Sequence, residues 1–149
     1  MGLMIGTGTT MTYCLTHDDT ANIGTTTGII QQLSNVPFRA TSHKDKNTGK
    51  SIVKQQFIEP FVVPHFVGFS VATFEAGQIM MPAHTHETLH EFFYVLEGSA
   101  VFVVDGVEHK VGPQTFFHLA PGESHGIYVP EDSVDGAMKM AVFGVVTNR

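Results

Sequence analysis

The segment AHTHETLHEFFYVLEG, residues 83–98, places three histidines and three glutamates within sixteen residues. Imidazole and carboxylate groups bind divalent transition metals and transfer protons near neutral pH. In an extended strand, His84 and His86 would point to the same face, with their Cα atoms roughly 6.6 Å apart. Pro82 disfavours a helix at this point. We therefore expect the two imidazoles to converge on one ion.

Two further side chains can reach such a site from neighbouring elements. Glu91 opens the apolar run that follows, and His125 comes shortly after a Pro-Gly turn. Three neutral imidazoles and one carboxylate form a donor set that suits divalent Fe, Mn, Ni, Zn, Co or Cu. Such a set leaves one or two coordination positions open, and open positions distinguish a catalytic metal from a structural one.

The spacing of these residues resembles the first motif of the cupin family. That motif reads Gly, five residues, His-x-His, three or four residues, Glu, six residues, Gly. This chain reads Gly77, six residues, His84-Thr85-His86, four residues, Glu91, six residues, Gly98. The first motif, at 77–98, therefore agrees in its histidines, its glutamate and its last glycine.

The second motif, at 112–125, is looser. The family pattern is Gly, five residues, Pro-x-Gly, two residues, His and then Asn. Here two extra residues follow Gly112, the proline is displaced to Pro121, and Val129 stands where Asn is common. The resemblance extends over residues 66 to 146. It implies a double-stranded β-helix barrel whose metal ligands are His84, His86, Glu91 and His125.

Length and composition predict a protein with one compact domain. Of the 149 residues, 42% are hydrophobic and 15% are charged, so a core can form and disorder is not expected. The net charge of −6 and the lack of a basic stripe argue against nucleic-acid binding. The single cysteine, Cys14, fits a reducing compartment, and no apolar stretch is long enough to span a membrane. We expect a cytoplasmic protein with no nucleic-acid or membrane partner.

The order of predicted elements indicates an N-terminal arm and one β domain. Residues 1–36 are rich in Thr and Gly and are expected to be extended, with a weak helical candidate at 26–36. Residues 37–149 are expected to form a single domain of short antiparallel strands, a sandwich or barrel. Asp105-Gly106 is the strongest hairpin signal. Strands are expected at 52–59, 66–77, 92–98, 99–106, 107–112, 115–125, 126–132 and 137–146, and a solvated loop at 43–50.

Side-chain alternation predicts which residues line a pocket beside the metal. Phe93 and Val95 share the face of Glu91, so both are expected in the pocket. Phe74 and Met80 are expected to pack in the barrel or to line the same pocket. Tyr94 faces the other way and is expected in the core. By the resemblance, some cupin lyases carry a Tyr base where Phe93 stands, which argues against that lyase chemistry.

Several other ionisable residues are candidates for a role in the site. His118 and Glu123 are candidates for an acid or base, with a packed or interface position as the alternative for His118. His90 precedes Glu91, so on a regular strand it faces away from the ion. The alternatives for His90 are replacement or support of Glu91 as a ligand. His43 is expected to be exposed.

Three functions agree with these expectations. The first is a metal-dependent oxygenase that acts on a small neutral or aromatic organic substrate, because the expected pocket is apolar and has few cations. Single-domain cupins of this length include many dioxygenases that resemble the quercetin- and cysteine-oxidising types. The second function is a non-redox isomerase, cyclase or lyase that uses the metal, and the third is non-catalytic binding of a small molecule. The resemblance also implies a homodimer.

Overall fold

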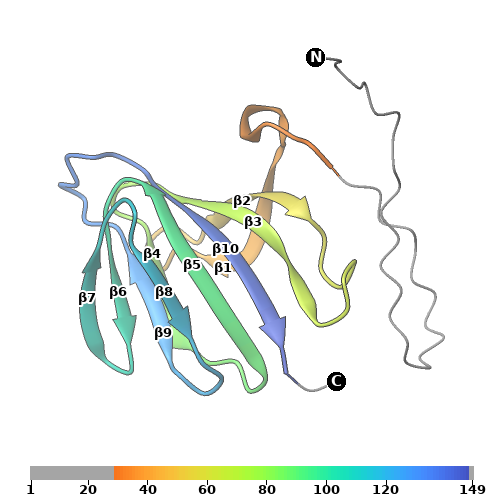
Figure 1. The fold of residues 1–149 in the computed structure, drawn as a ribbon. Helices are drawn as coiled ribbons and strands as arrows, with labels where there is room; N and C mark the ends of the chain where they lie inside the picture. Colours follow the sequence, from red (N-terminus) through yellow and green to blue (C-terminus); the bar gives the residue numbers. More distant parts are fainter. Residues whose placement is uncertain (1–28, 148–149) are drawn as a thin grey trace, which may run out of the picture. The chain divides into compact units, whose positions relative to one another are not determined.

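The computed structural model describes residues 29–147 (Figure 1). Of these, residues 31–147 belong to one compact unit, and the helical candidate at 26–36 contributes to it only the 3-10 turn η1 (Leu33–Asn35). No helix among the described residues is long and apolar enough to cross a membrane. The predicted arm falls mostly outside the described range, so the boundary at residue 36 stays a prediction. The strands are β1 (Phe38–Lys44), β2 (Ser51–Ile58), β3 (Phe66–Phe74), β4 (Ile79–His84), β5 (Leu89–Glu97), β6 (Ala100–Val104), β7 (Val107–Val111), β8 (Phe116–Leu119), β9 (His125–Tyr128) and β10 (Met138–Val146).

Two antiparallel sheets build this unit (Figure 1). The larger sheet has the strand order β1-β2-β3-β10-β5-β8, and the smaller sheet has the order β4-β9-β6-β7. All neighbouring strands in both sheets run antiparallel. The expected all-β fold of antiparallel strands is therefore confirmed.

The hydrophobic core receives side chains from both sheets. The ring of Phe93 on β5 lies 5.4 Å from the ring of Phe102 on β6 and stacks on Phe117 of β8 at 4.8 Å, measured between centroids. Full burial of one such side chain stabilises the fold by roughly 1.5–3 kcal/mol. Alternation along each strand directs these residues inward. Further core residues are Ile52, Phe74, Val95 and Met140 from the larger sheet and Met80, Val111 and Ile127 from the smaller one.

The predicted hairpin at Asp105-Gly106 joins β6 to β7. The φ angles of the two residues are 47° and 80°. A type I′ turn requires this left-handed conformation at both central positions, and Asp and Gly are among the residues that tolerate it. The hairpin prediction is confirmed.

The segment expected to be a solvated loop, 43–50, is partly strand and partly buried. His43 and Lys44 are the last residues of β1, and Asp45 is only 2% exposed. The carboxylate of Asp45 accepts hydrogen bonds of 2.8 Å from the backbone nitrogens of Thr48 and Ile79. The prediction is right for residues 46–50, which form an exposed turn, and wrong for 43–45. Asp45 organises the turn and ties it to β4, which a polar composition does not reveal.

The core position expected for Tyr94 is also wrong. Tyr94 is 39% exposed on the outer face of β5, where Leu96 is exposed as well. The strand alternation was interpreted correctly, because Phe93 and Val95 are buried on the other face. At this position on β5 the outer face is not covered by other described residues, so the large side chains of Tyr94 and Leu96 remain in contact with solvent.

Candidate metal centre

His84 and His125 lie opposite each other on paired strands. His84 ends β4, His125 begins β9, and the two residues are partners in the antiparallel ladder. Directly opposed residues in such a ladder project to the same face of the sheet. Their ring centroids are 4.3 Å apart, and His125 is only 3% exposed. The pairing of β4 with β9 therefore brings residues from the two sequence motifs into contact.

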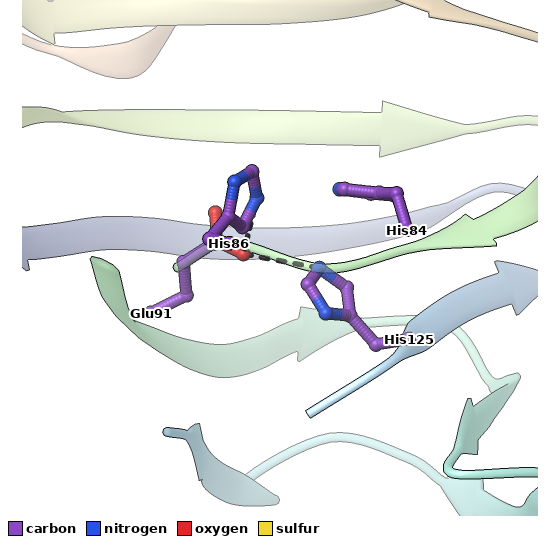
Figure 2. Close-up of side chains that lie close together, drawn as sticks. All are labelled: His84, His86, Glu91 and His125. Atoms are coloured by element: carbon purple, nitrogen blue, oxygen red, sulfur yellow. Dashed lines mark ion pairs between the residues drawn. The ribbon is translucent and has the colours of Figure 1, made fainter. Parts of the chain in front are cut away.

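His86 reaches the same point from the segment that follows β4, and Glu91 reaches it from β5. Because β4 ends at His84, His86 does not lie in a regular strand. Its carbonyl oxygen accepts a 2.9 Å hydrogen bond from the backbone nitrogen of Gly122, in the turn that precedes His125. Glu91 projects from β5 of the larger sheet. One ligand atom from each of the four side chains lies within 4.8 Å of the others (Figure 2).

The surroundings of the Glu91 carboxylate favour the binding of a cation at this point. Its Oε2 atom lies 3.1 Å from Nε2 of His125 and 3.3 Å from Nε2 of His86 (Figure 2). Oε2 is buried, yet no described residue gives it an aligned hydrogen bond. A buried carboxylate oxygen without a donor is costly unless a cation compensates it. Two donors on one transition metal lie roughly 3–4.4 Å apart, so these residues fit one ion with small side-chain adjustments.

The protonation of His125 suits a ligand that uses its Nε2 atom. Nδ1 of His125 lies 3.3 Å from the backbone carbonyl oxygen of Glu123. A carbonyl oxygen only accepts hydrogen bonds, so Nδ1 carries the proton in this contact. In the neutral ring, Nε2 then presents its lone pair on the side of Glu91. Metal-binding histidines are commonly oriented by such a hydrogen bond from the second ring nitrogen.

The electrostatics of the cluster favour the deprotonated ligands that a metal requires. Burial lowers the pKa of His84 to about 4, and the neighbouring imidazoles of His125, His43 and His86 add to this effect. Burial raises the pKa of Glu91, but contact with His125 and the charges of the surrounding imidazoles outweigh burial, so its pKa lies below the usual value. At neutral pH the cluster therefore contains a neutral His84 and an ionised Glu91.

A cavity of about 310 Å³ opens beside the cluster and is lined by His84, Glu91 and His125. This volume is at the lower end of ligand pockets, so it suits a small molecule. Aromatic side chains form one part of its wall, among them Phe74, Phe93 and Phe102. Polar side chains of β1 and β2 form another part, among them His43, Lys54 and Gln56.

Comparison with known proteins identifies the family. A model of the cupin domain matches residues 70–142, a range that includes all four residues of the cluster. The chain belongs to the cupin superfamily. No curated protein sequence matches this cupin.

Three solved structures share the cupin fold with this chain. A predicted oxalate decarboxylase from Thermotoga maritima is 16% identical, with a TM-score of 0.68, over 80% of this chain and 100% of its own. The polyketide cyclase RemF from Streptomyces resistomycificus is 21% identical, with a TM-score of 0.65, over 80% of each chain. A sugar phosphate isomerase from Silicibacter pomeroyi is 20% identical, with a TM-score of 0.63, over 80% of this chain and 76% of its own. Identities this low establish the fold alone.

Of the four pocket residues predicted for this cupin, three line the cavity. Phe74, Met80 and Phe93 do so. Val95 does not line the cavity and is fully buried in the core. The correct face was therefore predicted for Val95, but its side chain packs in the core and not in the cavity wall.

The two predicted acid–base residues lie away from the cavity. His118, on β8, is exposed and stacks on the ring of Phe92 at 4.7 Å. The carboxylate of Glu123 accepts a 2.6 Å hydrogen bond from the backbone nitrogen of Ala120 and so closes the turn before His125. Neither position supports a catalytic role, although the backbone of Glu123 orients His125.

His90 points to the other face of β5 from Glu91. Its Nδ1 atom lies 2.8 Å from Nε2 of His118, and the two rings stack at 5.0 Å. The structure therefore gives no support to His90 as a replacement for Glu91. The rule of strand alternation, which placed His90 away from the ion, agrees with this position.

His43 is the residue beside the centre that the sequence did not indicate. It is half-buried in the cavity wall, and its ring centroid lies 4.8 Å from that of His84. Burial lowers its pKa, while Glu91 partly opposes this effect. The expectation that His43 is exposed is wrong. Its strand, β1, lacks an apolar run, and the only signal was the Asn47-Thr48-Gly49 turn, which implies a hairpin with β2.

Proposed function

We propose that this cupin is a metal-dependent enzyme that acts on a small organic substrate. In this proposal His84, His86, Glu91 and His125 hold one divalent transition metal, with Fe, Mn, Ni, Zn, Co and Cu as the candidates. The observation that carries the proposal is the opening of the cluster into a cavity: three of the four residues line it. A purely structural site would be closed by protein ligands on all sides.

A bound metal of this kind would polarise a substrate oxygen and lower the pKa of a water or hydroxyl group beside it. The chain itself supplies a group for proton transfer. His43 lies in the cavity wall, and its lowered pKa, caused mainly by burial, keeps its imidazole neutral near pH 7. A neutral imidazole accepts a proton from a substrate carbon or hydroxyl group and returns it to another position.

Among reaction classes, we favour non-redox chemistry: an isomerase, cyclase or lyase with His43 as the acid–base residue. The specific support is the position of His43 beside the cluster. The names of the three similar structures, a predicted decarboxylase, a cyclase and an isomerase, agree with this class. The sequence suggested His118 and Glu123 as acid–base residues, and in this proposal His43 has that role instead.

An oxygenase that acts on a neutral or aromatic substrate is the second candidate. The aromatic part of the cavity wall, formed by Phe74, Phe93 and Phe102, favours it. A donor set of three imidazoles and one carboxylate also suits redox-active Fe, Mn or Cu. Of the two candidates, only the oxygenase requires molecular oxygen.

The experiment begins with elemental analysis of protein purified without added metal. Metal-loaded protein is then incubated with a panel of small aromatic and hydroxylated acids, amides and ketones, in air and under nitrogen. Turnover is followed by NMR in D₂O, which detects proton exchange and new products, and by an oxygen electrode. Metal-dependent exchange under nitrogen that the His43→Phe variant loses supports the non-redox class. Oxygen uptake coupled to product supports the oxygenase, and absence of bound metal contradicts both.

A further inference from the structure

The part of the cavity wall that β2 forms contains an unpaired cation. On β2, alternate residues Ile52, Lys54 and Gln56 line the cavity. The amide nitrogen of Gln56 donates to the backbone carbonyls of Ile58 and Phe69, which fixes this side chain. Lys54 is half-buried, and no described carboxylate forms an ion pair with it.

Two other cations of the larger sheet have partners, whereas Lys54 and the exposed Lys44 have none among the described carboxylates, and of these two lysines only Lys54 lines the cavity. Arg39 pairs with Glu59 at 2.6 Å and Lys139 pairs with Glu97 at 2.8 Å. Lys54 is also close enough to His43 for its charge to lower the pKa of that imidazole, together with the larger effect of burial. The ammonium group therefore lies on the same side of the cavity as the acid–base residue.

With a divalent cation held by the cluster, the balance of charge in the cavity would favour an anionic ligand. Glu91 is the one acidic residue among those that line it. A divalent cation held by the cluster would more than neutralise that carboxylate, and Lys54 would then add a second positive contribution. In a partly desolvated cavity such a field attracts anions.

We infer that the substrate carries a carboxylate group that pairs with Lys54 while its apolar body lies against the aromatic wall. The inference deepens the proposed function, on which it rests for the use of this cavity as the substrate site. Lysine binds an anion as a point charge through up to three donors. Lys54 would thus determine which end of the substrate faces the cluster, as a binding and specificity residue.

A monocarboxylate fits the cavity better than a phosphate ester does. Phosphate carries up to two negative charges, and its sites usually combine several cationic or backbone donors. Lys54 is the only lysine or arginine among the residues that line this cavity. The volume of about 310 Å³ and the phenylalanine rings suit a small aromatic acid. The inference keeps the aromatic substrate that the sequence suggested but differs from the neutral one, an expectation that rested on a pocket with few cations.

The test compares pairs of probes that differ only in charge. Binding of benzoate and phenylacetate is measured by calorimetry against the amides benzamide and phenylacetamide. The proteins are the wild type, the Lys54→Met variant and the Lys110→Met variant, which removes the same charge from an exposed position on β7. Each protein is measured after chelator treatment and again after metal loading, because a carboxylate can also bind a metal directly.

The inference predicts that Lys54→Met weakens binding of the acids by roughly tenfold or more, in both the chelated and the loaded protein. Binding of the amides should change by less than about twofold, and Lys110→Met should match the wild type. Equal affinity of wild type and Lys54→Met for the acids, or no binding of either acid, overturns the inference. Tighter binding of phenyl phosphate than of benzoate overturns the choice of a monocarboxylate.

The same measurements separate this inference from the proposed function. If the wild type holds no metal but Lys54 still controls binding of the acids, the enzyme proposal fails and the anion site remains. If metal binds and turnover occurs while Lys54→Met has no effect on affinity or KM, the enzyme proposal remains and the anion site is wrong.

Discussion

Oε2 of Glu91 lies 3.1 Å from Nε2 of His125, although the two residues belong to strands of different sheets. Glu91 is on β5 of the larger sheet, and His125 is on β9 of the smaller one. The contact therefore exists only when the two sheets are packed together. The geometry of the candidate centre is a property of the folded unit and not of either motif alone.

Replacement of Glu91 by Gln should remove most of the metal. The variant keeps the shape of the side chain but loses the negative charge that the three imidazoles surround. Loss of outer-shell partners alone commonly weakens metal affinity by 10–100-fold, so loss of a direct ligand should cost at least as much. Elemental analysis and competition with a chelator measure the effect.

His90→Ala is the matched control for this variant. His90 is the neighbour of Glu91 in the chain but points to the opposite face, toward His118. Metal content and affinity should equal those of the wild type. Loss of metal in His90→Ala with retention in Glu91→Gln would contradict the ligand set proposed for this cupin.

The buried carboxylate of Asp45 should make stability depend on acidic pH. Hydrogen bonds from the Thr48 side chain and from the Ile79 backbone lower the pKa of Asp45 from 3.8 to about 2, against an opposing effect of burial. A lowered pKa in the folded state stabilises the protein above the unfolded value, and this contribution is lost as the pH falls from about 4 through about 2.

Asp45→Asn should lower the free energy of unfolding by about 1–3 kcal/mol at neutral pH, because charge-assisted hydrogen bonds are lost. The difference from the wild type should shrink as the pH approaches 2. Urea unfolding followed by circular dichroism at several pH values measures both effects. A difference that is constant with pH would show that ionisation of Asp45 does not stabilise the fold.

Gly98→Ala should destabilise the protein far more than Gly106→Ala. Both glycines have positive φ angles, 71° and 80°, so both variants incur the strain of a left-handed alanine. A Cβ on Gly98 would also lie 2.5 Å from the carbonyl oxygen of Ala137, whereas a Cβ on Gly106 would meet nothing within 4 Å. We expect a loss of about 1 kcal/mol for Gly106→Ala and about 3 kcal/mol or more for Gly98→Ala, measured by thermal unfolding. Equal losses would mean that β10 moves aside at little cost.

Val95→Ala should affect stability and leave ligand binding intact. Val95 is fully buried but does not line the cavity. Removal of two methyl groups from a packed core should cost about 1–3 kcal/mol. Affinity for benzoate should change by less than about twofold, as measured by calorimetry. A large loss of affinity would place Val95 in the binding site, as its alternation with Phe93 first suggested.

Much of the fold could be predicted because its signals are local. The Asp105-Gly106 hairpin and the alternation of Phe93 and Val95 with exposed Tyr94 and Leu96 are visible within a few residues. The two motifs also indicated which four side chains would meet, through family resemblance. Spacing along one strand could not place them, since His86 follows the end of β4 and His125 comes from another strand.

The residues on the polar side of the cavity could not be predicted, because their positions depend on pairing between strands that are distant in the sequence. His43 and Lys54 lie on β1 and β2, before the region that resembles the family motifs, and neither strand has a strong apolar pattern. Their positions follow from the pairing of β2 with β3, which brings that hairpin onto the larger sheet. The expected homodimer and cytoplasmic location stay predictions; light scattering and cell fractionation test them.

The origin of the four side chains in two sheets has a consequence for the motions of the protein. An ion in this site would be held by His84 and His125 of the smaller sheet and by Glu91 of the larger one. It would cross-link the two sheets, because they could not separate at this edge without releasing the ion. Amide hydrogen exchange at the ends of β4, β5 and β9 would then slow when the ion binds. Local separation of the two sheets and dissociation of the metal would thus occur in the same step and at the same rate.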